Sequence, residues 1–147
     1  MRDANLLPEL IYLAAERAPD AAALTYGKET LSNAHLDDAV RRFASGLIAL
    51  GLQRGERVAI YLEKRFETVI ASFGAPAAGG VFVPLNPLLK AEQIGYILRD
   101  CNVRVLLTSP ERLELLLETL PACPDLRHIV VVNSVEQQRQ IGALNIC

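Results

Sequence analysis

The sequence predicts an α/β fold: a parallel sheet of βαβ units covered by helices on both faces, preceded by a small N-terminal helix and hairpin. Two observations lead to this prediction. Between residues 57 and 133, short runs of β-branched and apolar residues alternate with segments whose apolar residues recur at three- and four-residue steps. Strands that alternate with helices of about ten residues form right-handed βαβ units, and the sheet they build is buried on both faces.

Three elements are expected before this alternation begins. The apolar residues of the first helix share helical spacing: Leu7, Leu10, Ile11 and Ala14. Two short strands, AAALTYG and ETL, then flank a turn at Gly27-Lys28. A longer amphipathic helix is predicted over residues 33–50, with Ser32 or Asn33 as its N-cap and Gly51 just past its end.

The alternating region is expected to contain strands and helices in turn. The predicted strands are Arg57–Glu63, Val81–Asn86, Val103–Ser109 and His128–Asn133. The intervening helices are predicted over FETVIASFGAPAAG, KAEQIGYILRD and PERLELLLETL, and Pro110 opens the last of them. The final segment, SVEQQRQIGALNIC, has no convincing amphipathic pattern.

One uncharged run, from Thr68 to Leu89, is long enough to be tested as a membrane span, which needs about 20 apolar residues. Helix-breaking residues interrupt it: Gly74, Gly79, Gly80, Pro76, Pro84 and Pro87. Because a lipid-exposed helix would have to accommodate all of these residues, the run is interpreted as a helix, a glycine turn and a buried strand.

Composition narrows the possible classes of function. The chain has 147 residues, of which 51% are hydrophobic and 22% charged, enough for one core, and its formal charge is −2. No basic cluster with interleaved aromatic residues is visible, so nucleic acid is not an expected partner. Cys101, Cys123 and Cys147 are far apart and lack a metal-ligand spacing, which predicts reduced thiols and a cytoplasmic protein. Asp3 and Glu9 interrupt any signal-peptide core, so no export signal is expected.

Polar residues close the predicted strands at Glu63, Asn86, Ser109 and Asn133. Ligands of parallel sheets bind at the carboxyl ends of the strands. No glycine-rich phosphate loop follows a strand, however, and one carboxylate is too few for a divalent cation. His35 and His128 have no evident serine or cysteine partner. The residues therefore indicate no catalytic, cofactor-binding or metal-binding side chain.

Two motifs resemble the early part of the AMP-forming acyl-CoA synthetases, the adenylate-forming ligase superfamily. LSNAHLDD corresponds to the family's Leu-Thr-Tyr-x-Glu-Leu segment, and PAAGGVFVPLNP to its Lys-Ala-Gly-x-x-Tyr-Val-Pro-Leu-Asn/Asp-Pro segment. The resemblance covers residues 5–133 and departs from the family at Asn33, His35, Ala77 and Phe82. YLEKRFETV and the segment from Leu88 onward are most similar to the exosortase-associated acyl-CoA ligases.

The resemblance implies a scaffold role for five residues of the second motif: Gly79, Gly80, Pro84, Asn86 and Pro87. A wall near an acyl or pantetheine tunnel is the alternative role for this motif. The family's ATP-binding elements lie downstream of the represented region, so no catalytic residue can be carried over. We expect residues 1–133 to form the N-terminal subdomain of an AMP-binding ligase domain, and residues 134–147 to begin an incomplete continuation or tail.

The activity that the resemblance implies belongs to a parent enzyme. Such an enzyme would use ATP and Mg²⁺ to convert a carboxylic or fatty acid into an acyl-adenylate, and then CoA to form the acyl-CoA. This chain alone is expected to bind none of these cofactors and to be inactive, and its partner would be the remainder of the ligase polypeptide. The alternative is a standalone α/β binding or interaction module derived from the same scaffold.

Overall fold

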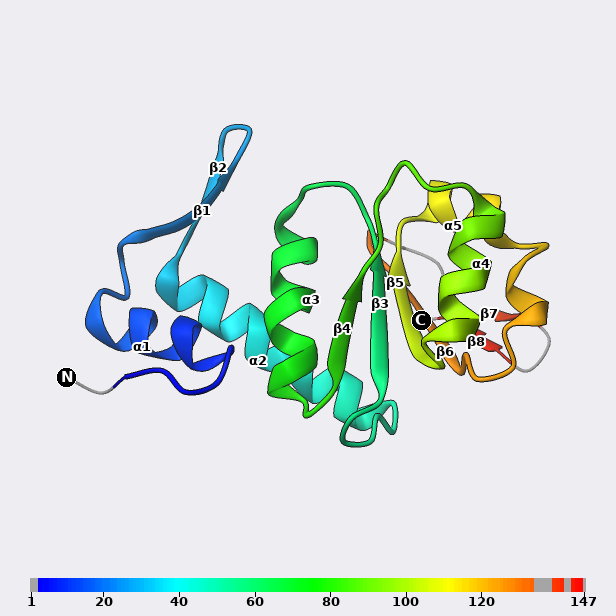
Figure 1. Cartoon of the computed structure of the whole chain (residues 1–147). Helices are drawn as coiled ribbons and strands as arrows, with labels where there is room; N and C mark the ends of the chain where they lie inside the picture. The colour runs from blue at the N-terminus through cyan, green and yellow to red at the C-terminus, as the bar shows by residue number, and fades with distance from the viewer. Residues whose placement is uncertain (1–2, 134–138, 142–143, 147) are drawn as a thin grey trace.

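Six strands form one sheet in the computed structural model, which describes residues 3–133, 139–141 and 144–146 (Figure 1). They are β3 (Arg57–Tyr61), β4 (Val81–Pro84), β5 (Val103–Thr108), β6 (His128–Val131), β7 (Arg139–Ile141) and β8 (Leu144–Ile146). Their order is β4-β3-β5-β6-β8-β7, in which β7 alone runs antiparallel to its neighbour. The parallel β4-β3-β5-β6 core confirms the predicted fold class.

The predicted strands have the right order, but the structure ends all four of them earlier. Strand β3 ends at Tyr61 and β6 at Val131, each two residues before the predicted end. The residues beyond these ends no longer pair with a neighbouring strand and enter the following loops. The sequence of side chains does not show where backbone pairing stops. After Asn133, where no pattern was visible, the structure adds β8 beside β6 through backbone pairing.

The N-terminal elements are a helix, a hairpin and a second helix: α1 (Glu9–Arg17), β1 (Ala22–Tyr26), β2 (Glu29–Ser32) and α2 (Asn33–Ala49). The hairpin forms its own two-stranded sheet, and the turn glycine, Gly27, has a φ of +61°. Ser32 caps α2 by accepting a hydrogen bond from the His35 N–H at 3.2 Å. The predicted apolar face of α1 is wrong: Leu7 and Leu10 are 39% and 53% exposed, Ile11 and Ala14 are half-buried, and the buried residue of the helix is Leu13, which the spacing did not indicate.

The uncharged run folds as a helix end, a turn and a strand. Helix α3 (Phe66–Ala77) ends at a turn in which Gly79 has a φ of +84°, and β4 follows directly. Among the described residues, no helix has the length and apolar character needed to cross a membrane.

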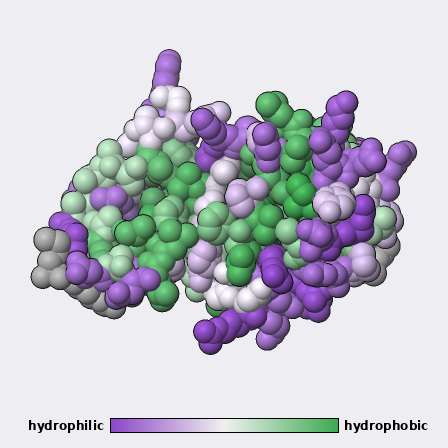
Figure 2. Space-filling view, viewed as in Figure 1, coloured by the Kyte–Doolittle hydropathy of each residue, from purple (hydrophilic) through white to green (hydrophobic). Residues whose placement is uncertain are grey.

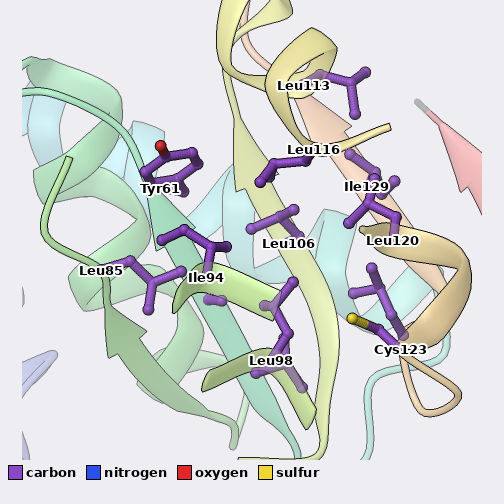
Figure 3. Packing of buried hydrophobic residues seen from close by; sticks show 13 residues of the cluster. Tyr61, Leu85, Ile94, Leu98, Leu106, Leu113, Leu116, Leu120, Cys123 and Ile129 are labelled. Atoms are coloured by element: carbon purple, nitrogen blue, oxygen red, sulfur yellow. The ribbon is translucent and has the colours of Figure 1, made fainter. Parts of the chain in front are cut away.

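Helices cover both faces of the parallel strands. Helices α2 and α3 pack on one face, where Leu47 and Ala75 meet Val58 and Val105. The other face is covered by α4 (Ala91–Asp100), α5 (Pro110–Leu116) and a short 3-10 helix, η1 (Leu120–Ala122). Figure 3 shows the side chains of this second core converging between these helices and the sheet; those labelled are Tyr61, Leu85, Ile94, Leu98, Leu106, Leu113, Leu116, Leu120, Cys123 and Ile129.

Candidate functional site

The strand order reverses between β3 and β5, which are neighbours in the sheet. From β3 the chain passes through α3 on one face to β4, and from β5 it passes through α5 on the opposite face to β6. The loop that follows β3 and the loop that follows β5 therefore leave the carboxyl ends of these strands toward opposite faces of the sheet. In open α/β sheets, this is the place where ligands bind.

The structure brings the predicted strand-end residues together at the carboxyl ends of the parallel strands, referred to here as the carboxyl edge. Glu63 follows β3, Asn86 follows β4 and Ser109 follows β5. Ser109 is 3% exposed and serves as the N-cap of α5, because its hydroxyl accepts from the Arg112 N–H at 3.4 Å. Asn133 follows β6 at the same end of the strands. These residues include a single carboxylate, as the sequence predicted.

Two arginines that the sequence analysis missed neutralise this edge. Glu63 accepts from Arg112 Nε at 3.2 Å and from Arg65 Nη1 at 3.3 Å, and Arg65 also pairs with Glu67 at 2.8 Å. Arg112 is the third residue of a helix that starts immediately after β5, so its place near a strand end could have been read from the sequence. Its pairing with Glu63, 49 residues away, could not.

The carboxylates of this network are held in their charged form. A hydrogen bond from its own backbone N–H lowers the pKa of Glu63, and Arg112 and Arg65 add to this effect against the cost of desolvation. Desolvation is the largest influence on Glu67 and raises its pKa, but the hydrogen bond from Arg65, a hydrogen bond from its own backbone N–H and the charge of Arg65 together lower the pKa of Glu67. Each carboxylate is thus an acceptor already engaged by a guanidinium.

The loop between β4 and α4 closes one side of the site. The Asn86 side chain accepts from the Leu88 N–H at 2.9 Å, which folds the loop into a local turn. Two side chains reach into it from outside: Arg112 Nη1 donates to the Pro87 carbonyl at 2.8 Å, and the Tyr61 hydroxyl donates to the Leu89 carbonyl at 3.0 Å. The predicted motif residues Asn86 and Pro87 therefore belong to this edge.

The glycines of the same motif lie at the amino ends of the strands, just before β4. The Gly79 carbonyl accepts from the Gly55 N–H at 2.8 Å. A Cβ on Gly80 would lie 2.9 Å from Leu52 Cδ2 and 3.1 Å from the Glu56 carbonyl oxygen. Pro84 ends β4 on the outer edge of the sheet, where a residue without an N–H is tolerated. The motif thus runs along the outer strand β4, from the amino ends of the strands to their carboxyl ends, and its scaffold role stays a prediction.

A second ion network ties the amino ends of the strands. Arg104 contacts Glu56 at 3.3 Å and Asp125 at 2.8 Å, and Arg127 contacts Glu56 at 3.4 Å. Hydrogen bonds from Asn102 and then Arg104 lower the pKa of Asp125. Because ligands of parallel sheets bind at the carboxyl ends, we assign this network to the scaffold.

The remaining candidates are local contacts. The sequence indicated no partner for His35, whereas the structure places Ser32 Oγ 3.1 Å from its Nδ1, in an exposed helix cap. His128 Nδ1 is buried without a hydrogen-bond partner among the described residues. Cys101 and Cys123 are free thiols, and burial raises the pKa of Cys123; Cys147 lies outside the described residues.

No group of three or more His, Cys, Asp or Glu side chains that could hold a metal occurs within the described ranges. Comparison with known families gives a match to the AMP-binding enzyme family over residues 12–144. The chain belongs to the AMP-binding enzyme family. It corresponds to the N-terminal part of the family's domain.

Relatives of this AMP-binding chain include two groups, peptide synthetases and a fatty-acid–CoA ligase. It is 36% identical to tyrocidine synthase 3 of Brevibacillus parabrevis over 82% of its own length, which is 2% of that protein. It is 39% identical to a long-chain-fatty-acid–CoA ligase of Bacillus subtilis strain 168 over 69% of its own length, which is 18% of that ligase. The chain thus spans a small part of the curated relatives it matches.

Solved structures also match this chain over only a part of their own length. The anthranilate CoA ligase AuaEII, in complex with anthranoyl-AMP, superposes with a TM-score of 0.84 and 27% identity, covering 90% of this chain and 26% of that one. MbtA of Mycobacterium smegmatis superposes with a TM-score of 0.80 and 27% identity, covering 90% and 25% respectively. The AMP-binding chain therefore shares its architecture with about a quarter of each of these larger proteins.

Proposed function

We propose that the chain is the N-terminal subdomain of an AMP-forming acyl-CoA ligase in the cytoplasm. The parent enzyme would activate a carboxylic or fatty acid with ATP to an acyl-adenylate and then transfer the acyl group to CoA. The observation that carries the proposal is the likeness to the CoA ligase solved with anthranoyl-AMP, at a TM-score of 0.84. The 39% identity to the Bacillus subtilis long-chain-fatty-acid–CoA ligase supports it.

The described residues do not fit a site for Mg²⁺ and ATP by themselves. Mg²⁺ prefers carboxylate, phosphate and water oxygens, and the Glu63 and Glu67 carboxylates at the crevice are engaged by Arg65 and Arg112. We derive no reaction step through the metal or the nucleotide. This chain's contribution is to form one wall of the crevice and to hold the strand-end loops in place.

We therefore expect the 147-residue chain alone to be inactive. The test is release of pyrophosphate in the presence of Mg²⁺, ATP and a panel of fatty acids. No release above a protein-free blank is expected. Turnover that copurifies with the chain through successive columns would contradict the proposal.

A second candidate is the corresponding part of a peptide synthetase, whose substrate would be an amino acid. The 40% identity to surfactin synthase subunit 3 of Bacillus subtilis, over 65% of this chain, favours it. Both candidates would use the same scaffold, because the two groups of relatives match overlapping parts of one chain.

A chimera distinguishes the two candidates. The chain would replace the matching segment of the Bacillus subtilis long-chain-fatty-acid–CoA ligase, and a control chimera would carry the matching segment of tyrocidine synthase 3. Acyl-CoA formation by the first chimera and not by the control is the expected result. A first chimera that folds but is as inactive as the control would favour the peptide synthetase.

A further inference from the structure

The loop of residues 85–90 is held at two points on either side of Leu88. The Pro87 carbonyl accepts from Arg112 Nη1 at 2.8 Å, and the Leu89 carbonyl accepts from the Tyr61 hydroxyl at 3.0 Å. Leu88 itself is 87% exposed. The loop is therefore fixed by its backbone while its central side chain projects into solvent.

The two side chains that hold the loop also contact each other. The Arg112 guanidinium carbon lies 4.8 Å from the centre of the Tyr61 ring, a distance typical of a cation–π contact. Tyr61 is 2% exposed and lies at the margin of the core in Figure 3. Arg112 thus rests on a buried ring whose hydroxyl is bonded to the same loop.

Glu63 orients the guanidinium. It accepts from Nε of Arg112 at 3.2 Å, which leaves Nη1 directed at the Pro87 carbonyl. A single guanidinium consequently joins the segments that follow β3, β4 and β5, because Glu63, Pro87 and Arg112 each follow one of these strands. The three segments surround the place where the strand order reverses.

We propose that Arg112 is a positioning residue that sets the shape of the 85–90 loop at this crevice, acting through the Pro87 carbonyl and the Tyr61 ring. An exposed ion pair with Glu63 alone would have little effect on stability. The bond to a loop carbonyl has a different consequence, because losing it releases one segment while the strands stay paired. This inference concerns the loop itself and does not depend on the reaction that the parent enzyme catalyses.

Native-state proteolysis of the 147-residue chain tests the proposal. An endoproteinase that cuts only after lysine cleaves after Lys90, at the end of the loop, and after Lys28, in the distant β1-β2 turn, which provides an internal reference. It does not cut at arginine, so the arginine-to-glutamine variants neither remove nor add a cleavage site. Both lysines are exposed, so cleavage is governed by opening of the backbone around them. The ratio of the two cleavage rates, followed by mass spectrometry, measures opening of the loop relative to the rest of the chain.

Arg112→Gln is expected to raise this ratio by about tenfold, and Tyr61→Phe, which removes only the hydroxyl, by a smaller factor. Arg42→Gln is the matched control, because Arg42 also forms an ion pair, with Asp38 at 2.8 Å, but lies on α2 far from the loop in the sequence. The control ratio should equal that of the wild type. Arg112→Lys should raise the ratio less than Arg112→Gln does. Its ammonium keeps the charge but cannot reach both Glu63 and Pro87 as the guanidinium does.

A ratio within twofold of the wild type in both Arg112→Gln and Tyr61→Phe would overturn the proposal. So would an equal rise at Lys28 and Lys90, because that result reports general destabilisation. If Arg112→Gln does not fold, Arg112→Lys decides, because it keeps the charge and loses the bond that reaches Glu63 and Pro87 together. No ligand or activity enters the measurement, so its failure is distinguishable from failure of the proposed ligase function.

Discussion

Single side chains fasten the central strands to one another at the crevice. Thr108 is fully buried at the end of β5, and its hydroxyl donates to the Tyr61 carbonyl of β3 at 3.0 Å. This carbonyl belongs to the residue whose ring carries Arg112. The position of the Tyr61 ring therefore depends on a polar contact in the interior as well as on apolar packing.

Replacing Thr108 with valine removes this hydroxyl and keeps the branched shape. We expect the free energy of unfolding to fall by about 1–3 kcal/mol, because a buried acceptor loses its partner. Urea denaturation provides the measurement. Thr25→Val is the control, since Thr25 pairs with Thr30 in the exposed hairpin. Equal losses in the two variants would contradict the role assigned to burial.

Glu63 makes the stability of the crevice depend on pH. Its pKa in the folded chain is lowered from the ordinary value of 4.5, so its stabilising contribution is present above that value and is lost as the pH falls through the folded pKa. The difference in melting temperature between the wild type and Glu63→Gln should therefore be largest at about pH 7 and shrink as the pH falls below 4.5 toward the lowered folded pKa. A difference that is constant over this range would show that the charge of Glu63 has no role.

At the scale of the elements, the connection from α3 to β4 depends on close backbone approach. A Cβ on Gly80 would be 3.1 Å from the Glu56 carbonyl and 3.3 Å from the Ala75 carbonyl, which are backbone atoms of the neighbouring segments. Gly46, on the exposed side of α2, has no atom within 4 Å of its hypothetical Cβ. The two glycines therefore offer a matched comparison.

Gly80→Ala should lower the free energy of unfolding by about 1–3 kcal/mol, because the fixed carbonyls cannot move away from the added methyl group. Gly46→Ala should raise it by about 0.5–1 kcal/mol through helix propensity alone. Thermal and chemical denaturation of both variants would check that the free energy of unfolding falls in Gly80→Ala and rises in Gly46→Ala. Stabilisation by Gly80→Ala would mean that the turn tolerates a side chain.

At the scale of the molecule, an apolar surface lies over the N-terminal elements. Leu6, Leu7 and Leu10 are 65%, 39% and 53% exposed, and Figure 2 shows apolar residues gathered over this end and α3. Large contiguous apolar patches are rare on monomers and mark contact surfaces. We propose that this surface is where the chain packs against the remainder of the ligase polypeptide.

We expect the wild-type chain to bind a hydrophobic dye and to associate in light scattering. The double variant Leu7→Glu/Leu10→Glu should reduce both signals, because it introduces charge into the patch. Leu115→Glu is the control, since Leu115 is 65% exposed on α5, away from α1 in the sequence. A wild-type chain that is monomeric and binds no dye would favour the standalone module.

The sequence alone was enough to predict the fold class and most elements, because apolar periodicity and capping residues are local. Ser32 and Gly51 mark the ends of α2 where the structure has them, and Pro110 opens α5. The strand-end residues Glu63, Asn86 and Ser109 were also placed correctly at one edge, since parallel strands share a direction.

The tertiary structure decided which of these segments meet. Strand order determines that β3 lies between β4 and β5, and only this order brings Glu63 beside Arg112 and Arg112 beside Pro87. Neither pair is local, because their members are 49 and 25 residues apart. Periodicity shows which face of an element is buried, whereas contacts between elements depend on their arrangement around a shared core.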